Sequence, residues 1–264
     1  MRGVTVAYAE GNSGATVSSV TRYALRDISF ALKRGELVAV IGPNGAGKST
    51  LLRLAAGTIK PSVGTVLTHG TLPSEHICIA FVPQRSQVDL SFPVTVEDVV
   101  MMGRVRQIGL FRRPHRRDWE YVRKSLERVN AVDLAKRQIG ELSGGQQQRV
   151  FIARALAQET DLMLLDEPMT GLDVPSQEKI LEILGNLRPD GVTVLVATHD
   201  LNLAAERFDR VMLLNKKLLA FGPGAEVVTT ENLLAAYGGH IHHKNTLILD
   251  DDSESGDETH GMAI

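Results

Sequence analysis

Residues 42–49 read Gly-Pro-Asn-Gly-Ala-Gly-Lys-Ser, a spacing that suits a loop around a chain of phosphates. The loop follows five apolar residues and precedes a helical pattern. Its backbone N–H groups can turn inward onto phosphate oxygens, and the helix N-terminus adds a favourable partial charge. The lysine can reach the β- and γ-phosphates, and the serine hydroxyl can ligate Mg²⁺. These residues and the next one predict a nucleotide site: Gly42, Pro43, Asn44, Gly45, Ala46, Gly47, Lys48, Ser49 and Thr50.

Two adjacent carboxylates end a second apolar run, Leu162-Met-Leu-Leu-Asp166-Glu167. The carboxyl ends of parallel strands meet at one edge of a sheet, where ligands bind in open α/β folds. Asp166 is placed to hold Mg²⁺, and Glu167 to orient or deprotonate a water that attacks the γ-phosphate. The alternative for this stretch alone is a helix-capping Asp beside a surface Glu.

A histidine follows a third apolar run, in Thr198-His199-Asp200. A single histidine is more often structural than catalytic. At the edge of the sheet that carries Lys48 and Glu167, however, His199 could hydrogen-bond the γ-phosphate and sense its loss.

The sequence Leu142-Ser-Gly-Gly-Gln146 opens another helix and offers a second nest of N–H groups for an anion. One domain does not need two such nests for one triphosphate. The second nest therefore predicts a head-to-tail, two-fold dimer with two ATP molecules at its interface.

The elements that must position these groups alternate between strand and helix. Three apolar runs without polar alternation, 37–41, 162–165 and 192–197, predict parallel strands that are buried on both faces. Helical patterns occupy 48–56, 146–158 and 177–187, and they indicate a doubly wound α/β fold. Residues 4–6 and 27–32 alternate and predict a small antiparallel β layer. We further expect helices from Pro93 to about Asn130, a hairpin over 210–221, and a helix that Thr230 caps and Gly238 ends.

Composition limits the class of protein. The chain has 264 residues, 43% of them hydrophobic, 29 Lys+Arg against 31 Asp+Glu, and one cysteine, Cys78. One cysteine excludes an internal disulfide framework and fits a reducing compartment. No stretch reaches the roughly 18 apolar residues that span a bilayer, and no signal peptide is evident, so we expect a cytosolic protein or one that is peripheral through a partner. We expect one domain over 1–249 with a helical insert at about 85–160, and a disordered acidic tail over 250–264.

The order of these motifs resembles the nucleotide-binding subunit of an ATP-binding cassette (ABC) transporter over about residues 4–240. The motifs are the phosphate loop, Gln84 in Phe-Val-Pro-Gln, the Leu142–Gln146 signature, Asp166-Glu167, the loop Gly171-Leu-Asp173, and His199. The resemblance implies a P-loop NTPase (RecA-like) core with a mostly parallel sheet, an N-terminal antiparallel β layer and an inserted helical subdomain.

The resemblance also implies roles for single residues. Gln84 would contact Mg²⁺ and the water and relay the nucleotide state to the helical insert and a membrane partner. Asp173 would link the two sites of the dimer, His199 would be the switch, and Tyr8 would stack on adenine, with Tyr23 as a competing aromatic. The signature residues that would meet the partner's γ-phosphate are Ser143, Gly144, Gly145 and Gln146.

This ATPase would drive a separate permease with several membrane spans, because the sequence contains no stretch that predicts a transmembrane helix. The stretch Ser91–Arg104 is similar to bacterial importers of manganese, zinc and iron, with iron-siderophore and haem importers as the alternative. Such an importer implies an extracytoplasmic substrate-binding protein and a place at the cytoplasmic face of the membrane. A soluble ABC ATPase acting on ribosomes or DNA is less favoured, because the chain has one cassette and no long coiled-coil insert.

Two groups of residues stay open at this level. The insert carries eight basic residues against Asp118 and Glu120, which suits either an anionic lipid surface or a solvated face. Residues 1–249 have a net charge of only +4, from 29 basic and 25 acidic residues, so we expect no nucleic-acid partner. The second group is His240, His242 and His243. These histidines could form a regulatory metal site, but solvated histidines at the end of a domain are the favoured alternative. The basic residues are Arg104, Arg106, Arg112, Arg113, Arg116, Arg117, Arg123 and Lys124.

Overall fold

The protein is described here by a computed structural model, which covers residues 1–9, 21–68, 70–73, 78–85, 92–109 and 112–238. The expected acidic tail, the three C-terminal histidines and most of the loop after Tyr8 lie outside the described residues. Within the described part of the chain, no helix combines the length and the apolar character needed to cross a membrane.

A six-stranded sheet forms the centre of the molecule, with the order β5-β6-β7-β3-β8-β9. Five strands are parallel, and β9 pairs antiparallel with β8. Residues of β3 and β7 are buried along their whole length, as their unbroken apolar sequences require. The expected parallel strands and hairpin are therefore confirmed. The strands are β3 (Leu37–Ile41), β5 (Ile79–Val82), β6 (Leu162–Asp166), β7 (Thr193–Ala197), β8 (Arg210–Asn215) and β9 (Lys217–Gly222).

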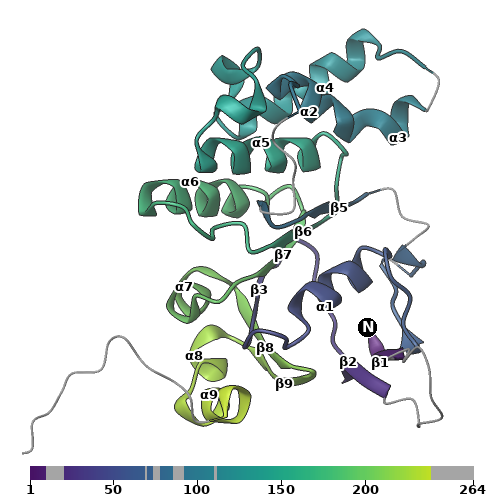
Figure 1. The fold of residues 1–264 in the computed structure, drawn as a ribbon, viewed down its shortest axis with the longest axis vertical. Coiled ribbons are helices and arrows are strands. Elements are labelled where there is room, and N and C mark those ends of the chain that lie inside the picture. The colour runs from purple at the N-terminus through teal and green to yellow at the C-terminus, as the bar shows by residue number, and fades with distance from the viewer. Residues whose placement is uncertain (10–20, 69, 74–77, 86–91, 110–111, 239–264) are drawn as a thin grey trace, which may run out of the picture.

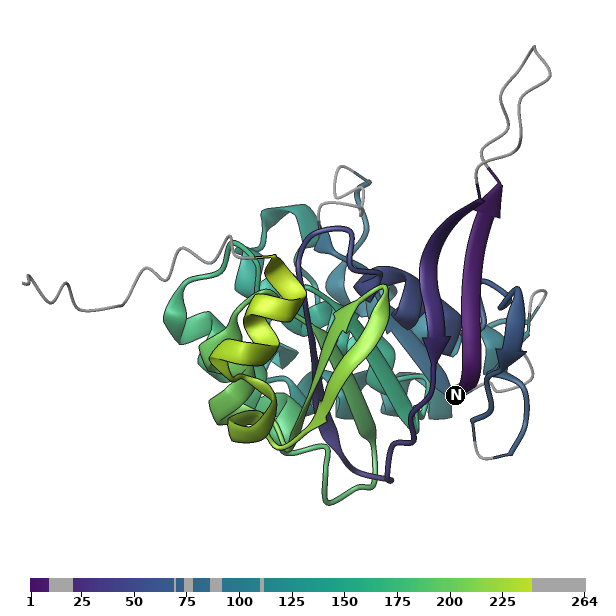
Figure 2. The same ribbon diagram turned by 90° about the horizontal axis from the view of Figure 1, so that it is seen from below.

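A smaller antiparallel sheet, in the order β2-β1-β4, lies beside this core (Figure 2). Its strands are β1 (Arg2–Ala9), β2 (Thr21–Ile28) and β4 (Val63–Thr65). The sheet confirms the expected β layer, but the expected strand over residues 27–32 is wrong, because β2 ends at Ile28. Asp27 has a φ of 49° and lies within the irregular register between Val4 and Val6 of β1, so the pairing past it is irregular, although Ile28 still pairs with Val4 and Phe30 exchanges backbone hydrogen bonds with Met1.

Helices cover both faces of the core sheet, so its two sides have separate hydrophobic clusters. On one face, α1 (Lys48–Ala55) packs with β1 and β2 against Val40, Leu164 and Leu195. On the other face, α5 (Gly144–Leu156) and α6 (Val174–Gly185) pack against Ile41, Val82 and Leu165. The three expected helices are thus present, and α5 and α6 begin two and three residues earlier than their apolar patterns suggest.

The segment between β5 and β6 folds into a helical lobe at one end of the molecule (Figure 1). Gly103 permits its tight packing, because a Cβ there would lie 2.3 Å from the carbonyl oxygen of Arg154 on α5. The lobe contains α2 (Val96–Met101), η3 (Met102–Arg104), α3 (Val105–Ile108), α4 (Arg116–Arg128), η4 (Val132–Leu134), η5 (Ile139–Glu141) and α5.

Three shorter helices lie toward the end of the described chain: α7 (Leu201–Arg207), α8 (Gly224–Val227) and α9 (Thr230–Tyr237). Gly238 ends α9 with a φ of 66°, as expected. The expected cap at Thr230 is wrong by one residue, because the Thr229 side chain accepts the hydrogen bond from Asn232 N.

Candidate functional site

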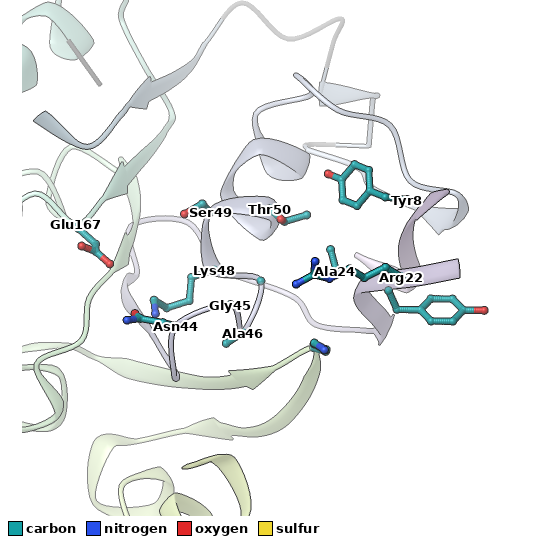
Figure 3. Close-up of a pocket in the computed structure, with 13 residues that line it drawn as sticks. Tyr8, Arg22, Ala24, Asn44, Gly45, Ala46, Lys48, Ser49, Thr50 and Glu167 are labelled. Atoms are coloured by element: carbon teal, nitrogen blue, oxygen red, sulfur yellow. The ribbon is translucent and has the colours of Figure 1, made fainter. Parts of the chain in front are cut away.

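A cavity of about 530 Å³ opens at the carboxyl edge of the core sheet, between the loop after β3 and the small sheet (Figure 3). Glu167 lies at one end of the group of lining side chains and Tyr8 at the other, with Lys48, Ser49 and Thr50 between them. Its lining residues are Tyr8, Arg22, Tyr23, Ala24, Asn44, Gly45, Ala46, Gly47, Lys48, Ser49, Thr50, Glu167 and Lys216.

Two glycines of the loop are required by its backbone. Gly42 has a φ of 151°, and a Cβ there would lie 2.0 Å from the carbonyl oxygen of Leu214. Gly47 precedes α1 with a φ of 98°, and a Cβ there would lie 2.6 Å from the carbonyl oxygen of Ala24. Only glycine fits both the conformation and the space at these two positions of the loop.

Lys48 is the first residue of α1 and is only 7% exposed. Its Nζ donates to the carbonyl oxygens of Gly42, at 2.7 Å, and of Pro43, at 3.3 Å. Burial lowers the pKa of Lys48, while the nearby carboxylates of Glu167 and Asp166 oppose that shift. The lysine therefore contributes a partly desolvated cation at the loop.

Asp166 ends β6 and is 4% exposed. Burial raises its pKa, and a hydrogen bond with the Ser49 hydroxyl acts in the opposite direction. A buried carboxylate beside a hydroxyl offers hard oxygen donors, which suit Mg²⁺. Among the described residues, no group of three or more His, Cys, Asp or Glu residues could hold a metal ion, so a cation here would need further oxygen ligands.

Glu167 adopts a left-handed conformation with a φ of 49°, which is uncommon for a residue with a side chain. Its backbone N–H donates to Ala197 O at 3.0 Å, which ties this turn to the end of β7. Its Oε2 accepts from Gln84 Nε2 at 3.0 Å and from Thr170 Oγ1 at 3.3 Å. The structure thus brings together Gln84 and Glu167, two of the residues that the sequence assigned to the site.

His199 follows β7 at the same edge of the sheet and is exposed. It is not among the residues that line the cavity. The structure therefore places His199 near the end of the sheet but leaves its expected contact with the γ-phosphate untested.

Two tyrosines line the cavity, and their surroundings differ. The guanidinium of Arg26 lies 4.8 Å from the centre of the Tyr23 ring, so one face of that ring is already covered. Tyr8 is 50% exposed, and its side chain lies above Thr50 in the view of Figure 3. The arrangement favours Tyr8 over Tyr23 as the ring available for stacking.

Sequence patterns missed two cations that line the cavity. Arg22 is opposite Tyr8 in the β1–β2 register, and Lys216 occupies the turn between β8 and β9. The backbone N–H of Lys216 donates to Ala46 O at 2.8 Å, so the hairpin turn packs directly on the phosphate loop. The hairpin itself was expected, but its position against a loop about 170 residues earlier has no local sequence signal.

The signature residues lie at the start of α5, away from this cavity. Ser143 caps the helix reciprocally: its hydroxyl accepts from Gln146 N at 3.4 Å, and its own N–H donates to Gln146 Oε1 at 3.0 Å. In Figure 1 the sheet separates α5 from α1, so one protomer does not bring its own signature to its own phosphate loop.

The signature glycines pack closely against the rest of the chain. A Cβ on Gly145 would lie 2.4 Å from Ser176 Oγ, and a Cβ on Gly144 would lie 2.1 Å from Arg85 Nη1. Asp173 caps α6 by accepting from Ser176 N at 3.3 Å, and a hydrogen bond with the Ser176 side chain lowers the pKa of Asp173. The structure therefore joins the Asp173 loop to the signature, which the sequence alone did not reveal.

Comparison with known proteins identifies the family. Residues 25–170 match the family described as ABC transporter. The chain is 47% identical to the chelated iron transport system membrane protein YfeB of Yersinia pestis, over 92% of this chain and 79% of that protein. It is 44% identical to the manganese transport system ATP-binding protein MntB of Bacillus subtilis, over 86% of this chain and 91% of that protein. It is also 44% identical to the zinc transport system ATP-binding protein TroB of Treponema pallidum, over 89% of each chain.

Solved structures agree with this result. A metal-chelate type ABC transporter in an inward-facing conformation has a TM-score of 0.73 and 36% identity, over 81% of this chain and 82% of that one. The dimeric ABC transporter cassette MJ0796 has a TM-score of 0.70 and 29% identity, over 84% of this chain and 97% of that one. The expected P-loop NTPase fold is confirmed, and the chain belongs to the ABC transporter family as an ATP-binding, ATP-hydrolysing cassette.

Proposed function

We propose that this chain is the ATPase subunit that energises a membrane permease importing a transition-metal ion, namely manganese, zinc or iron. The observation that carries the proposal is the 44–47% identity to ATP-binding proteins and a membrane protein of manganese, zinc and chelated-iron transport systems, over more than four fifths of this chain. The subunit would sit at the cytoplasmic face of the membrane through its permease, and an extracytoplasmic substrate-binding protein would deliver the cargo.

In this proposal the cavity binds ATP. The backbone N–H groups of residues 42–49 surround the phosphates, and Lys48 exchanges its carbonyl contacts for the β- and γ-phosphate oxygens. Tyr8 stacks on the adenine at the outer end of the cavity, where Arg22 adds a cation.

The donor set fits a magnesium ion. The Ser49 hydroxyl, the Asp166 carboxylate and the Gln84 amide oxygen supply hard oxygen ligands, and phosphate and water oxygens complete the six that Mg²⁺ requires. The buried Asp166, whose ionised form is disfavoured without a cation, supports this assignment. Mg²⁺ at this position would neutralise charge on the β- and γ-phosphates.

Glu167 is proposed as the residue that orients or deprotonates the attacking water. Its carboxylate lines the cavity, and the Gln84 and Thr170 hydrogen bonds fix its orientation. His199, next to the end of β7, would hydrogen-bond the γ-phosphate and respond to its loss.

The complete site requires a second copy of the chain. Ser143 and Gly145 of one protomer, with Gly144 and Gln146, would contact the ATP held by the phosphate loop of the other. Asp173 would link the two sites, since its helix cap packs on the signature glycines. The dimeric form of the cassette MJ0796 supports this arrangement.

The helical lobe is the proposed contact with the permease. Its exposed apolar side chains include Phe92, which is 65% exposed, Val105, 49%, and Met102, 47%. Gln84 lies two residues after the end of β5, where the chain passes from the core sheet into the lobe. Its hydrogen bond to Glu167 would therefore connect the hydrolysis site to the exposed apolar surface of the lobe.

The decisive experiment measures metal content by elemental analysis in a strain that lacks the gene, comparing manganese, zinc and iron. Loss of uptake of one metal, restored by the wild-type chain and not by Lys48→Ala, supports the proposal. Unchanged content of all three metals would refute import of a free ion. Loss of only a chelated form would favour an iron-siderophore or haem importer, which the chelated-iron and metal-chelate relatives make the second candidate.

A further inference from the structure

The outer side of α4 and the residues just before it carry a dense group of exposed basic side chains. Two acidic side chains lie among them: Glu120 pairs with Arg116 at 3.3 Å, and Glu127 pairs with Arg123 at 2.9 Å. Positive charge therefore dominates the surface. We call this surface the basic face, and it consists of Arg112, Arg113, Arg116, Arg117, Arg123 and Lys124.

Ion pairs within the chain do not neutralise all the charge of the basic face. Arg104, which the sequence groups with these residues, is different: it is 4% exposed and pairs with Asp118 and Glu159 inside the lobe. By contrast, Arg113 and Lys124 have no ion pair among the residues that the structure describes. The whole chain has a net charge of −2, so the basic face is a local feature and not a general property of the surface.

An exposed tryptophan lies within this surface. Trp119 is the only tryptophan of the chain and is 42% exposed. On the helix it is three residues after Arg116 and four before Arg123, so its indole lies beside both. An amphipathic indole flanked by arginines is typical of surfaces at the boundary between a membrane and water.

The position of the basic face in the fold agrees with that chemistry. Helices α2, α3 and α4 gather at the same end of the molecule (Figure 1). Phe92, Met102 and Val105, the exposed apolar residues proposed to meet the permease, belong to this lobe. A lobe that docks beneath a membrane-embedded partner brings its flanking surface close to the headgroups.

We propose that the basic face and Trp119 bind the anionic headgroups of a lipid bilayer. The inference rests on the proposed function only for the presence of a membrane nearby. Each basic residue near an anionic surface strengthens binding about fivefold at low ionic strength, and the attraction falls once the Debye length drops from about 10 Å to about 3 Å.

The test uses the purified full chain with vesicles of equal parts phosphatidylglycerol and phosphatidylcholine, and with vesicles of phosphatidylcholine alone. Cosedimentation gives the partition coefficient, and the emission of Trp119 reports the environment of the indole. We expect binding and a blue shift with the anionic vesicles at ~0.1 M ionic strength, and neither with phosphatidylcholine or at ~1 M.

A double variant, Arg113→Gln/Lys124→Gln, should weaken binding about 25-fold, because two basic residues are lost. The matched control is Lys60→Gln/Lys217→Gln, which removes the same charge from exposed sites outside the lobe. Equal weakening in both variants, or no binding to anionic vesicles, overturns the inference. Tighter binding to a short DNA duplex than to the anionic vesicles also overturns it, since it would assign the basic face to a nucleic acid.

ATP hydrolysis measured on the same preparations separates this inference from the proposed function. The basic face lies outside the cavity, so the double variant should hydrolyse ATP at the wild-type rate. Absence of vesicle binding with normal hydrolysis refutes lipid binding alone, whereas normal vesicle binding without hydrolysis refutes the ATPase site alone.

Discussion

Replacement of Arg104 by alanine removes the buried charge that joins the helices of the lobe. The Arg104 Nε donates to Asp118 Oδ1 of α4 at 3.3 Å. Its Nη1 donates to Ala157 O, at 2.9 Å, and to Glu159 Oε2, at 2.8 Å, just beyond α5. The guanidinium also lies 4.1 Å from the centre of the Tyr121 ring. One side chain thus connects η3, α4 and the end of α5.

The expected loss of stability follows from what Arg104→Ala leaves behind. Removal of one partner of a buried ion pair costs about 3–5 kcal/mol, mainly because the other charge stays buried. Asp118 keeps one hydrogen bond, from His115 N at 2.9 Å, and Glu159 is half exposed, so we expect the lower end of that range. About 3 kcal/mol corresponds to a fall in Tm of about 6–12 °C for a chain of this size.

The measurement is the free energy of unfolding in urea, followed by circular dichroism, together with Tm. Arg123→Ala is the control, because its pair with Glu127 is exposed and should contribute less than about 1 kcal/mol. In a double-mutant cycle, Arg104→Ala and Asp118→Ala should couple by at least ~1 kcal/mol. A cost below ~1 kcal/mol for Arg104→Ala, or additive effects in the cycle, would show that the buried pair does not hold the lobe together.

Four further expectations concern the nucleotide site. Glu167→Gln keeps a carbonyl oxygen that can accept from Gln84, so ATP binding should persist and a dimer should accumulate in gel filtration. The rate of ATP hydrolysis should fall about 10²–10⁴-fold, and a wild-type rate would exclude Glu167 as the base. Lys48→Ala should weaken ATP binding itself in equilibrium titration, and an unchanged affinity would contradict its phosphate contact. Tyr8→Ala should raise the Kd for ATP several-fold and Tyr23→Ala should change it less, because Arg26 already covers Tyr23; the reverse order would assign stacking to Tyr23. Burial raises the pKa of Asp166, so its ionised form destabilises the nucleotide-free fold above that pKa, and the penalty disappears as the pH falls toward about 4. Asp166→Asn should therefore raise Tm at neutral pH without nucleotide and abolish the additional stabilisation by ATP with magnesium; a lower Tm without nucleotide would contradict the stability claim.

Local sequence patterns were sufficient for the elements whose formation depends on near neighbours. The buried strands were predictable because unbroken apolar runs suit only a sheet covered on both faces. The phosphate loop was predictable from its glycine spacing, and at two of these glycines, Gly42 and Gly47, a Cβ would not fit. The end of β2 was not predictable. Phe30 and Leu32 continue the alternation of a strand, but the register shift beside the left-handed Asp27 makes the pairing irregular, and β2 ends at Ile28 although Phe30 still bonds to Met1.

The parts of the site that the sequence did not reveal depend on contacts between distant segments. Lys216 reaches the cavity because its N–H donates to Ala46, a pairing that local pattern does not encode. Arg104 was grouped with surface arginines because charge alone does not show burial, and the structure instead gives it two carboxylate partners inside the lobe. The distribution of charge could be read from the sequence, but not which charges remain available at the surface.

Two adjacent residues after β5 connect the parts of the nucleotide machinery that lie on different elements. Gln84 donates to the carboxylate of Glu167, at the edge of the sheet, and the guanidinium of the next residue, Arg85, packs over Gly144 at the start of α5. The Asp173 cap also reaches the signature, through Ser176. Because packed side chains at these distances do not move independently, we expect a shift of Gln84 that follows the γ-phosphate to displace the signature loop of the same protomer. In the proposed dimer that loop would contact the nucleotide of the second protomer, so this packing would link the state of one site to the shape of the other.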